Sequence, residues 1–211
     1  MTASYNQISI DKYRSHAEGY DASAELTMPL RRSTIDLLRL RAGDVVLDVG
    51  AGTGLSYPLL LDAVGATGRV LAFEQSPHMF AQAQARCERT DNRVAYQRVW
   101  HQCEAADKVI LPEPADAVLF NYVHDISRMP QAVANIMHQL KPGARVAMAG
   151  MKFFPWWTGP LNLLAWAKNR PYNALASDLW SPWDIVASYC KDFERRSTQC
   201  GMGFIAHGIL K

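Results

Sequence analysis

The sequence predicts an α/β fold in which helices sandwich a Rossmann-like, mostly parallel sheet. Three observations lead to this expectation. Val45–Val49 is apolar and rich in valine, as is typical of a parallel strand that is covered on both faces. A glycine-rich turn and a helical stretch follow directly, an arrangement that binds nucleotides in many folds. Further strand-like stretches recur downstream at the spacing of alternating strands and helices.

The overall composition indicates one globular domain over residues 1–211, since this length suffices for a sizeable core. Net charge is +2 with both signs mixed along the chain, so we expect no nucleic-acid-binding surface. The four cysteines show no metal-binding spacing, which predicts no metal and reduced thiols in the cytoplasm. The N-terminus is polar, and no apolar run approaches the roughly 18 residues of a membrane span, so we expect neither a signal peptide nor a span.

The elements can be placed along the chain from their periodicity and their turn residues. The first helix is expected to present Arg31, Arg32 and Arg39 on a solvated polar face, and Ser76 is expected to cap the third helix. His101 is expected in an exposed loop. We expect helices over 29–40, 55–64, from 77, over 130–140 and over 181–190, and strands over 45–49, 69–73, 94–99, 115–122, 145–149, 193–200 and 203–210.

The turn after the first strand carries the clearest functional signal. Gly50, Gly52 and Gly54 allow a sharp turn and let a ligand lie against bare backbone. Asp48 precedes the first glycine, and Glu74 ends the second strand. Dinucleotide dehydrogenases usually have the spacing G-x-G-x-x-G and no acid before it, so the pattern favours another nucleotide-like ligand.

Residues 47–54 (LDVGAGTG) resemble the first motif of class I S-adenosylmethionine-dependent methyltransferases of the small-molecule, quinone-biosynthetic type. The resemblance extends from about residue 13 to the C-terminus. It implies a seven-stranded sheet of order 3-2-1-4-5-7-6 with strand seven antiparallel, and S-adenosylmethionine as cofactor. Glu74 is then expected to accept hydrogen bonds from the two ribose hydroxyls. The residues expected to bind the cofactor are Tyr13, Asp48, Gly50, Ala51, Gly52, Thr53, Gly54, Glu74, Gln75, Met79, Glu104, Ala105 and Asn121.

Two further regions are expected near the substrate. Residues 1–27 resemble an N-terminal arm that folds over the cofactor, with Tyr20 toward the substrate; the alternative is a loosely attached helix. His124 follows the fourth strand, where methyl transfer takes place in this family. A histidine there resembles a base that takes the proton from a substrate hydroxyl, since its ordinary pKa is about 6.5. The alternative is that His124 only lines the site.

Residues 151–183 form an insert that holds five of the six tryptophans. In the family this region commonly covers the substrate, so Phe154, Trp156 and Trp157 are expected to contact it. Packing of the aromatic side chains onto the sheet is the plain alternative. The sharper alternatives are a large apolar pocket, an aromatic cage for a quaternary ammonium, or a tryptophan-rich surface at a membrane interface.

The sequence therefore predicts an S-adenosylmethionine-dependent methyltransferase that acts on a small or lipid-like acceptor, mainly by positioning the reactants. Peripheral membrane contact is compatible with this prediction, and the oligomeric state is left open. Two other functions stay open. One is a non-catalytic binding module that uses the insert as an interface, and the other is a nicotinamide-dependent reductase.

Overall fold

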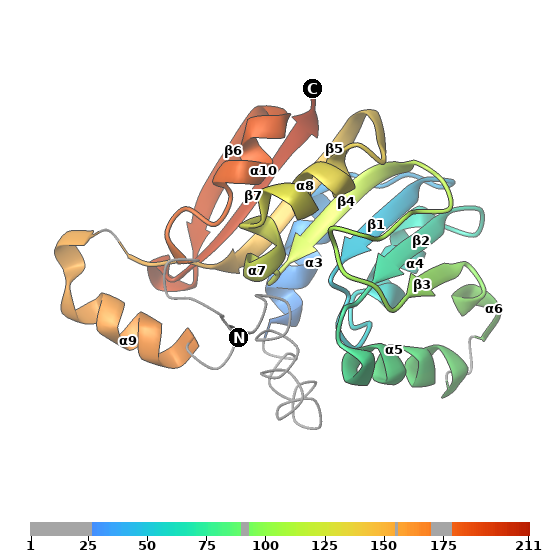
Figure 1. Cartoon of the computed structure of the whole chain (residues 1–211), viewed down its shortest axis with the longest axis horizontal. Helices are drawn as coiled ribbons and strands as arrows, with labels where there is room; N and C mark the ends of the chain where they lie inside the picture. The colour runs from blue at the N-terminus through green and yellow to red at the C-terminus, as the bar shows by residue number, and fades with distance from the viewer. Residues whose placement is uncertain (1–26, 90–92, 155, 170–178) are drawn as a thin grey trace.

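The computed structural model describes residues 27–89, 93–154, 156–169 and 179–211. Helices cover both faces of one seven-stranded sheet (Figure 1). In chain order the elements are α3 (Met28–Leu37), β1 (Val45–Val49), α4 (Tyr57–Val64), β2 (Arg69–Phe73), α5 (Pro77–Arg89), α6 (Arg93–Tyr96), β3 (Val99–Gln102), β4 (Ala115–Asn121), α7 (His124–Ser127), α8 (Pro130–Met137), β5 (Leu140–Met151), η1 (Trp156–Thr158), α9 (Pro160–Asn169), α10 (Asp184–Tyr189), β6 (Cys190–Thr198), η3 (Gln199–Gly201) and β7 (Gly203–Leu210).

The strand order is β3-β2-β1-β4-β5-β7-β6, as the sequence predicted. Strands β1 to β5 pair in parallel, and β7 runs antiparallel to both of its neighbours. β1 lies between β2 and β4, so the turn that follows β1 opens at the middle of the sheet edge. In a parallel sheet of this kind, ligands bind at the carboxyl ends of the strands, where the strand order reverses.

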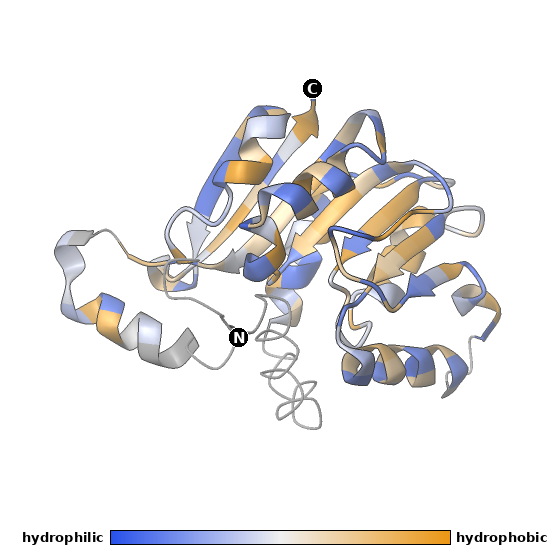
Figure 2. Ribbon diagram, viewed as in Figure 1, coloured by the Kyte–Doolittle hydropathy of each residue, from blue (hydrophilic) through white to orange (hydrophobic). Residues whose placement is uncertain are grey.

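Two apolar layers hold the helices on the sheet. One layer places Ile126 of α7, Ile136 of α8 and Val186 of α10 against one face. The other places Ile35 of α3 and Leu60 of α4 against the opposite face. Figure 2 shows the central strands as predominantly hydrophobic and the outer strand β6 as largely hydrophilic. Within the part of the chain that the structure describes, no helix has the length and apolar character needed to cross a bilayer.

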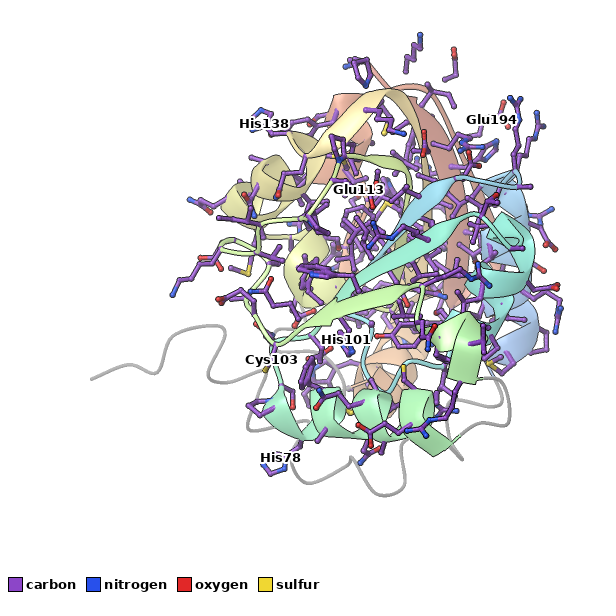
Figure 3. All side chains as sticks on the ribbon, turned by 90° about the vertical axis from the view of Figure 1, so that its right-hand side faces the viewer. His78, His101, Cys103, Glu113, His138 and Glu194 are labelled. Atoms are coloured by element: carbon purple, nitrogen blue, oxygen red, sulfur yellow. The ribbon has the colours of Figure 1, made fainter. Side chains whose placement is uncertain are left out.

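The third strand is the main error of the sequence prediction. Residues 93–96 form the short helix α6, in which Val94 is 75% exposed, and the strand lies at Val99–Gln102. His101 consequently lies in β3 and not in an exposed loop (Figure 3). Its ring lies 4.5 Å from Phe80 of α5 and 5.6 Å from Tyr57 of α4, between ring centroids. Because both ring nitrogens are buried without a hydrogen-bond partner, burial lowers the pKa of His101 to about 4.

Candidate functional site

The glycine-rich turn has a backbone that side chains disfavour. Gly50 and Gly52 have φ values of 57° and 59°. A Cβ on Gly50 would come within 2.7 Å of Val123 and 3.1 Å of Ile126, so the neighbouring α7 segment packs directly on it. A Cβ on Gly52 would meet no atom within 4 Å. Gly52 therefore borders open space, where a ligand can approach its backbone closely.

That space is a cavity open to solvent, and its empty volume of about 570 Å³ includes part of that open solvent. It lies at the carboxyl ends of β1, β2 and β4, where the parallel sheet is expected to bind its ligand. Its lining residues come from α3, the glycine-rich turn, the start of α5 and the β4–α7 connection. They are Arg31, Gly50, Ala51, Gly52, Thr53, Leu55, Glu74, Gln75, Met79, Asn121, Tyr122, Val123, Asp125 and Ile126.

Glu74, which directly follows β2, accepts hydrogen bonds from two parts of the cavity wall: the glycine-rich turn and the segment just before α5. The Gly52 N–H donates to its Oε2 at 3.0 Å, and the Ser76 N–H donates to its Oε1 at 2.7 Å. The Ser76 hydroxyl itself is buried without a partner, so the predicted side-chain cap of α5 does not form. Burial raises the pKa of Glu74 to about 7, although these two backbone hydrogen bonds oppose the rise. A carboxylate offers about four acceptor positions, so Glu74 retains acceptors for a ligand diol.

Arg31 is buried beside the cavity, and its predicted place on a solvated helix face is therefore wrong. Its exposed fraction is 5%, and its Nη1 donates to the Ser56 hydroxyl at 2.6 Å. Burial raises the pKa of Asp48 to about 6, although the Arg31 guanidinium and a hydrogen bond with Ser56 oppose the rise. Within the described residues, Arg31 Nε and Asp48 Oδ2 are both buried without a hydrogen-bond partner. This donor and this acceptor are the kind of orphaned groups that a zwitterionic ligand satisfies.

The end of β4 adds a third polar group. Asn121 lines the cavity with an exposed fraction of 6%, and neither its Oδ1 nor its Nδ2 has a hydrogen-bond partner. The next residue, Tyr122, has a φ of 61°, an unfavourable conformation for a tyrosine. Its N–H donates to the Ala149 carbonyl at 2.8 Å, which helps to hold the turn. Strained backbone of this kind is common at ligand sites.

His124 lies beside the cavity wall and contacts β5. Its Nε2 lies 2.9 Å from the Met151 nitrogen and 2.8 Å from the Met151 oxygen. Gly150 leaves room for the ring, because a Cβ at this position would come within 2.6 Å of Nε2. One ring nitrogen is thus used in tying α7 to the end of β5.

The structure brings together most of the predicted cofactor residues that it describes. Eight of them line the cavity: Gly50, Ala51, Gly52, Thr53, Glu74, Gln75, Met79 and Asn121. The other four described cofactor residues lie outside the lining: Asp48, Gly54, Glu104 and Ala105. The predicted base His124 lies outside it too. Asp48 is buried near the lining residue Arg31, and Gly54 leaves room for the ring of Tyr57. Glu104 Oε1 accepts a hydrogen bond from the Ala105 N–H at 2.8 Å.

Among the predicted substrate residues that the structure describes, Phe154 and Trp157 are not part of the cavity lining. Tyr13 and Tyr20 lie outside the described residues. Trp156 begins η1, and Trp157 beside it is 70% exposed. Phe154 is partly buried, and its backbone N–H and carbonyl both hydrogen-bond the side chain of Asn162, at 2.8 and 3.1 Å.

Sequence reasoning missed several residues of the wall. Arg31 looked like one of several arginines on a helix face, and only the packing of α3 over the glycine-rich turn buries it. The stretch 121–126 was expected at the transfer site from its position after the fourth strand, and its residues Tyr122, Val123, Asp125 and Ile126 line the cavity.

Comparison with known proteins agrees with this geometry. A family described as "Methyltransferase domain" matches residues 46–143. A 2-phytyl-1,4-naphtoquinone methyltransferase of Synechococcus elongatus is 27% identical over 122 residues, which cover 57% of this chain and 52% of that protein. A demethylmenaquinone methyltransferase of Tropheryma whipplei is 31% identical over 120 residues, covering 56% and 46%. The chain therefore spans about half the length of these curated relatives.

Solved structures share the fold across nearly the whole chain. A SAM-dependent methyltransferase from Aquifex aeolicus superposes with a TM-score of 0.67 at 20% identity, covering 93% of this chain and 98% of that one. A phospholethanolamine N-methyltransferase 2 of Haemonchus contortus, solved with phosphomonomethylethanolamine and S-adenosylhomocysteine, gives 0.72 at 14% identity, covering 100% and 60%. These comparisons make the chain similar to S-adenosylmethionine-dependent methyltransferases, and the family match covers the glycine-rich turn and strands β1 to β4.

Proposed function

We propose that the protein transfers a methyl group from S-adenosylmethionine to a small or lipid-like acceptor. The observation that carries this proposal is the cavity beside Gly52 and Glu74, where the glycine backbone and a carboxylate face the same space. The cofactor would supply a methyl group that the positive charge on sulfur already activates. The chain's own task is then to hold donor and acceptor in line, and such positioning can contribute several kcal/mol.

The cavity wall fits the chemical groups of this cofactor. Glu74 would accept from the ribose hydroxyls, and Met79 would pack against the adenine. The amino-acid end carries an ammonium and a carboxylate. Asn121 Oδ1 would accept from the ammonium, and buried Asp48 would supply negative charge nearby. Arg31 Nε would donate to the carboxylate. The assignments to the amino-acid end use polar atoms of Asn121, Asp48 and Arg31 that are buried without a hydrogen-bond partner in the described part of the chain.

The acceptor is proposed from the relatives and from the cavity wall. The two curated relatives are named for quinones, one of them phytylated. A hydroxyl acceptor would require a base to remove its proton, whereas an amine acceptor that binds in its neutral form would not. His124 as that base stays a proposal, and its Nε2 is in contact with Met151. We favour positioning over base catalysis, because Asp125 and not His124 lines the cavity.

Calorimetric titration with S-adenosylhomocysteine tests the proposal, and NADH is the control ligand. Binding of S-adenosylhomocysteine alone is expected. Binding of NADH would favour the reductase, and binding of neither ligand would favour a non-catalytic module that interacts through its tryptophans. The cytoplasmic location also stays a prediction.

A variant tests the role of Arg31 separately. We expect Arg31→Met to weaken the binding of S-adenosylhomocysteine by more than tenfold, because a charge-assisted hydrogen bond contributes roughly 1.5–3 kcal/mol. Binding of 5′-methylthioadenosine, which lacks the amino-acid group, should change little. Arg32→Met is the matched control, since Arg32 is the exposed neighbour on α3. Equal loss of both ligands would refute the carboxylate assignment.

A further inference from the structure

The chain makes a long excursion between β5 and α10, over residues 153–180, which we call the tryptophan loop. Its ends are joined: the Phe153 N–H donates to the Leu179 carbonyl at 3.0 Å, and the rings of Phe153 and Trp180 lie 5.0 Å apart. Within it, Asn162 of α9 hydrogen-bonds the Phe154 backbone. Figure 1 shows α9 on the β6 side of the sheet, away from β1, β2 and β3.

The tryptophan loop concentrates exposed apolar side chains. In the described part of the chain, seven large hydrophobic side chains are exposed, and five of them belong to this loop. They are Trp157 at 70%, Leu161 at 46%, Leu163 at 65%, Trp166 at 37% and Trp180 at 47%. The other two, Val94 and Ile110, occur singly elsewhere, as is normal on protein surfaces. A cluster of this kind marks an interaction site.

Helix α9 does not have the pattern of a helix that rests on its own domain. Leu161 and Leu163 are separated by two positions and so point in nearly opposite directions, yet both are exposed. Trp166 is also exposed and lies near the direction of Leu163. A helix with apolar residues on opposite faces is normally buried. The exposed faces of α9 are therefore expected to be covered by something outside the described core.

The charge of this region indicates what covers it. Over residues 152–180 the basic residues are Lys152, Lys168 and Arg170, and the one acidic residue is Asp178. Lys152 immediately precedes the loop, and its N–H donates to the Met202 carbonyl at 2.7 Å, beside η3. Exposed Arg195 and Arg196 occupy the half of β6 that leads to η3. The acids of β6, Asp192 and Glu194, belong to the half nearer Cys190.

We propose that the tryptophan loop docks on an anionic lipid bilayer, with Trp157, Leu163 and Trp166 entering the interface and the nearby basic residues Lys152 and Arg196 facing the lipid headgroups. Tryptophan is the side chain that is enriched at membrane interfaces, and basic residues add attraction to anionic lipids. This inference deepens the proposed function, on which it rests for one point: the bilayer is then the source of a lipid-like acceptor.

A second copy of the chain is the competing occupant. Two copies that met through this surface would bring the Lys152 and Arg195 side chains of one copy close to those of the other. Like charges oppose such a contact, whereas an anionic headgroup layer matches them. Basic residues outnumber acidic ones by three to one over residues 152–180, which favours the bilayer.

Co-sedimentation of the full chain with vesicles tests the proposal. One set of vesicles is phosphatidylcholine alone, and the other is an equal mixture with phosphatidylglycerol. We expect binding to the mixed vesicles that weakens at high salt, where the screening length falls to about 3 Å. Leu163→Ser and Trp157→Ser should each lower the affinity by about tenfold, because each removes a large apolar side chain from the interface.

Matched variants distinguish binding through the tryptophan loop from nonspecific hydrophobic adsorption and from an effect of net charge. Ile110→Ser removes an apolar side chain that is 77% exposed outside the loop, and it should leave vesicle binding unchanged. Arg196→Glu should weaken vesicle binding several-fold more than Arg93→Glu does. Arg93 is an exposed residue of α6, outside the loop, and its substitution changes the net charge by the same amount. Thermal unfolding of each variant checks that it folds.

The outcomes distinguish the proposals. Absence of vesicle binding, or equal losses in the loop and control variants, would overturn the docking surface. So would a concentration-dependent dimer that Leu163→Ser converts to a monomer. Titration with S-adenosylhomocysteine is measured on the same protein. Vesicle binding without S-adenosylhomocysteine binding would refute the proposed function alone, and the reverse result would refute the docking surface alone.

Discussion

Lowering the pH from 8 to 6 is expected to weaken the binding of S-adenosylhomocysteine through Glu74. In the free protein, burial raises the pKa of Glu74 to about 7. Two ribose hydroxyls would donate to this carboxylate, so the bound form requires it ionised and lowers its pKa. Binding therefore releases a proton at any pH at which Glu74 of the free protein is protonated. The affinity reaches its maximum above pH 7 and falls as the pH drops below 7.

The magnitude follows from the fraction of ionised Glu74. A group with a pKa of 7 is about nine-tenths ionised at pH 8 and about one-tenth ionised at pH 6. The dissociation constant should therefore rise by about tenfold, or roughly 1.4 kcal/mol. Asp48, whose pKa is about 6, adds a factor of about two at most at pH 6.

Calorimetry in buffers of different ionisation enthalpy measures the proton release directly. We expect almost none at pH 8, about half a proton at pH 7 and about nine-tenths at pH 6. In Glu74→Gln the ligand should bind more weakly, and this pH dependence should disappear. Equal affinity at pH 6 and pH 8 with no proton release would refute the reasoning, because it would mean that Glu74 does not meet the ligand as a carboxylate.

Three further predictions follow from particular contacts. Gly52→Ala should abolish S-adenosylhomocysteine binding while lowering stability by only about 1–2 kcal/mol, because the substitution strains φ but meets no atom; Gly50→Ala should unfold at a clearly lower temperature, since its Cβ meets Val123, and equal melting temperatures would contradict this. His101→Phe should remove the loss of folding stability that protonation of His101 causes at acid pH. The folded pKa of about 4 lies below the unfolded value of about 6.5, so the contribution of His101 is complete above pH 6.5 and falls toward pH 4, by about 2 kcal/mol at most at pH 5; urea unfolding at pH 5 and pH 8 measures it, and an unchanged pH profile would count against it. His124→Ala should lower stability by about 1–3 kcal/mol through loss of its contact with Met151; if turnover instead falls with no loss of stability, the base assignment gains support.

The sheet was predictable because its signals are local. β1, β2 and β7 lie where the apolar runs predicted them, and the glycine-rich turn lies where its spacing predicted. The strand order, in contrast, came from the family resemblance, because no local pattern specifies which strands become neighbours. Helix ends were predicted less well: α8 ends at Met137 and not at 140, because periodicity does not locate the last turn.

The errors arose where tertiary contacts decide the environment of a residue. Val94 has an apolar side chain with high strand propensity, yet α6 exposes it and the strand begins at Val99. Arg31 has the same local surroundings as Arg32, and only its position over the glycine-rich turn distinguishes them. Half of the cavity was thus predictable from motif spacing. The α3 side of its wall could not be, because the sequence does not show which helix residue faces the turn.

The contact between the two ends of the tryptophan loop has a consequence for how such proteins diversify. Because Phe153 and Leu179 are hydrogen-bonded to each other, the chain leaves and re-enters the domain at almost the same point. The intervening segment can therefore change in length or composition without altering the pairing of β5 with β7. Selection for a new acceptor or a new cellular surface can act on that segment while the cofactor-binding half stays constant. Exchanging the segment between relatives is accordingly a direct route to hybrid enzymes.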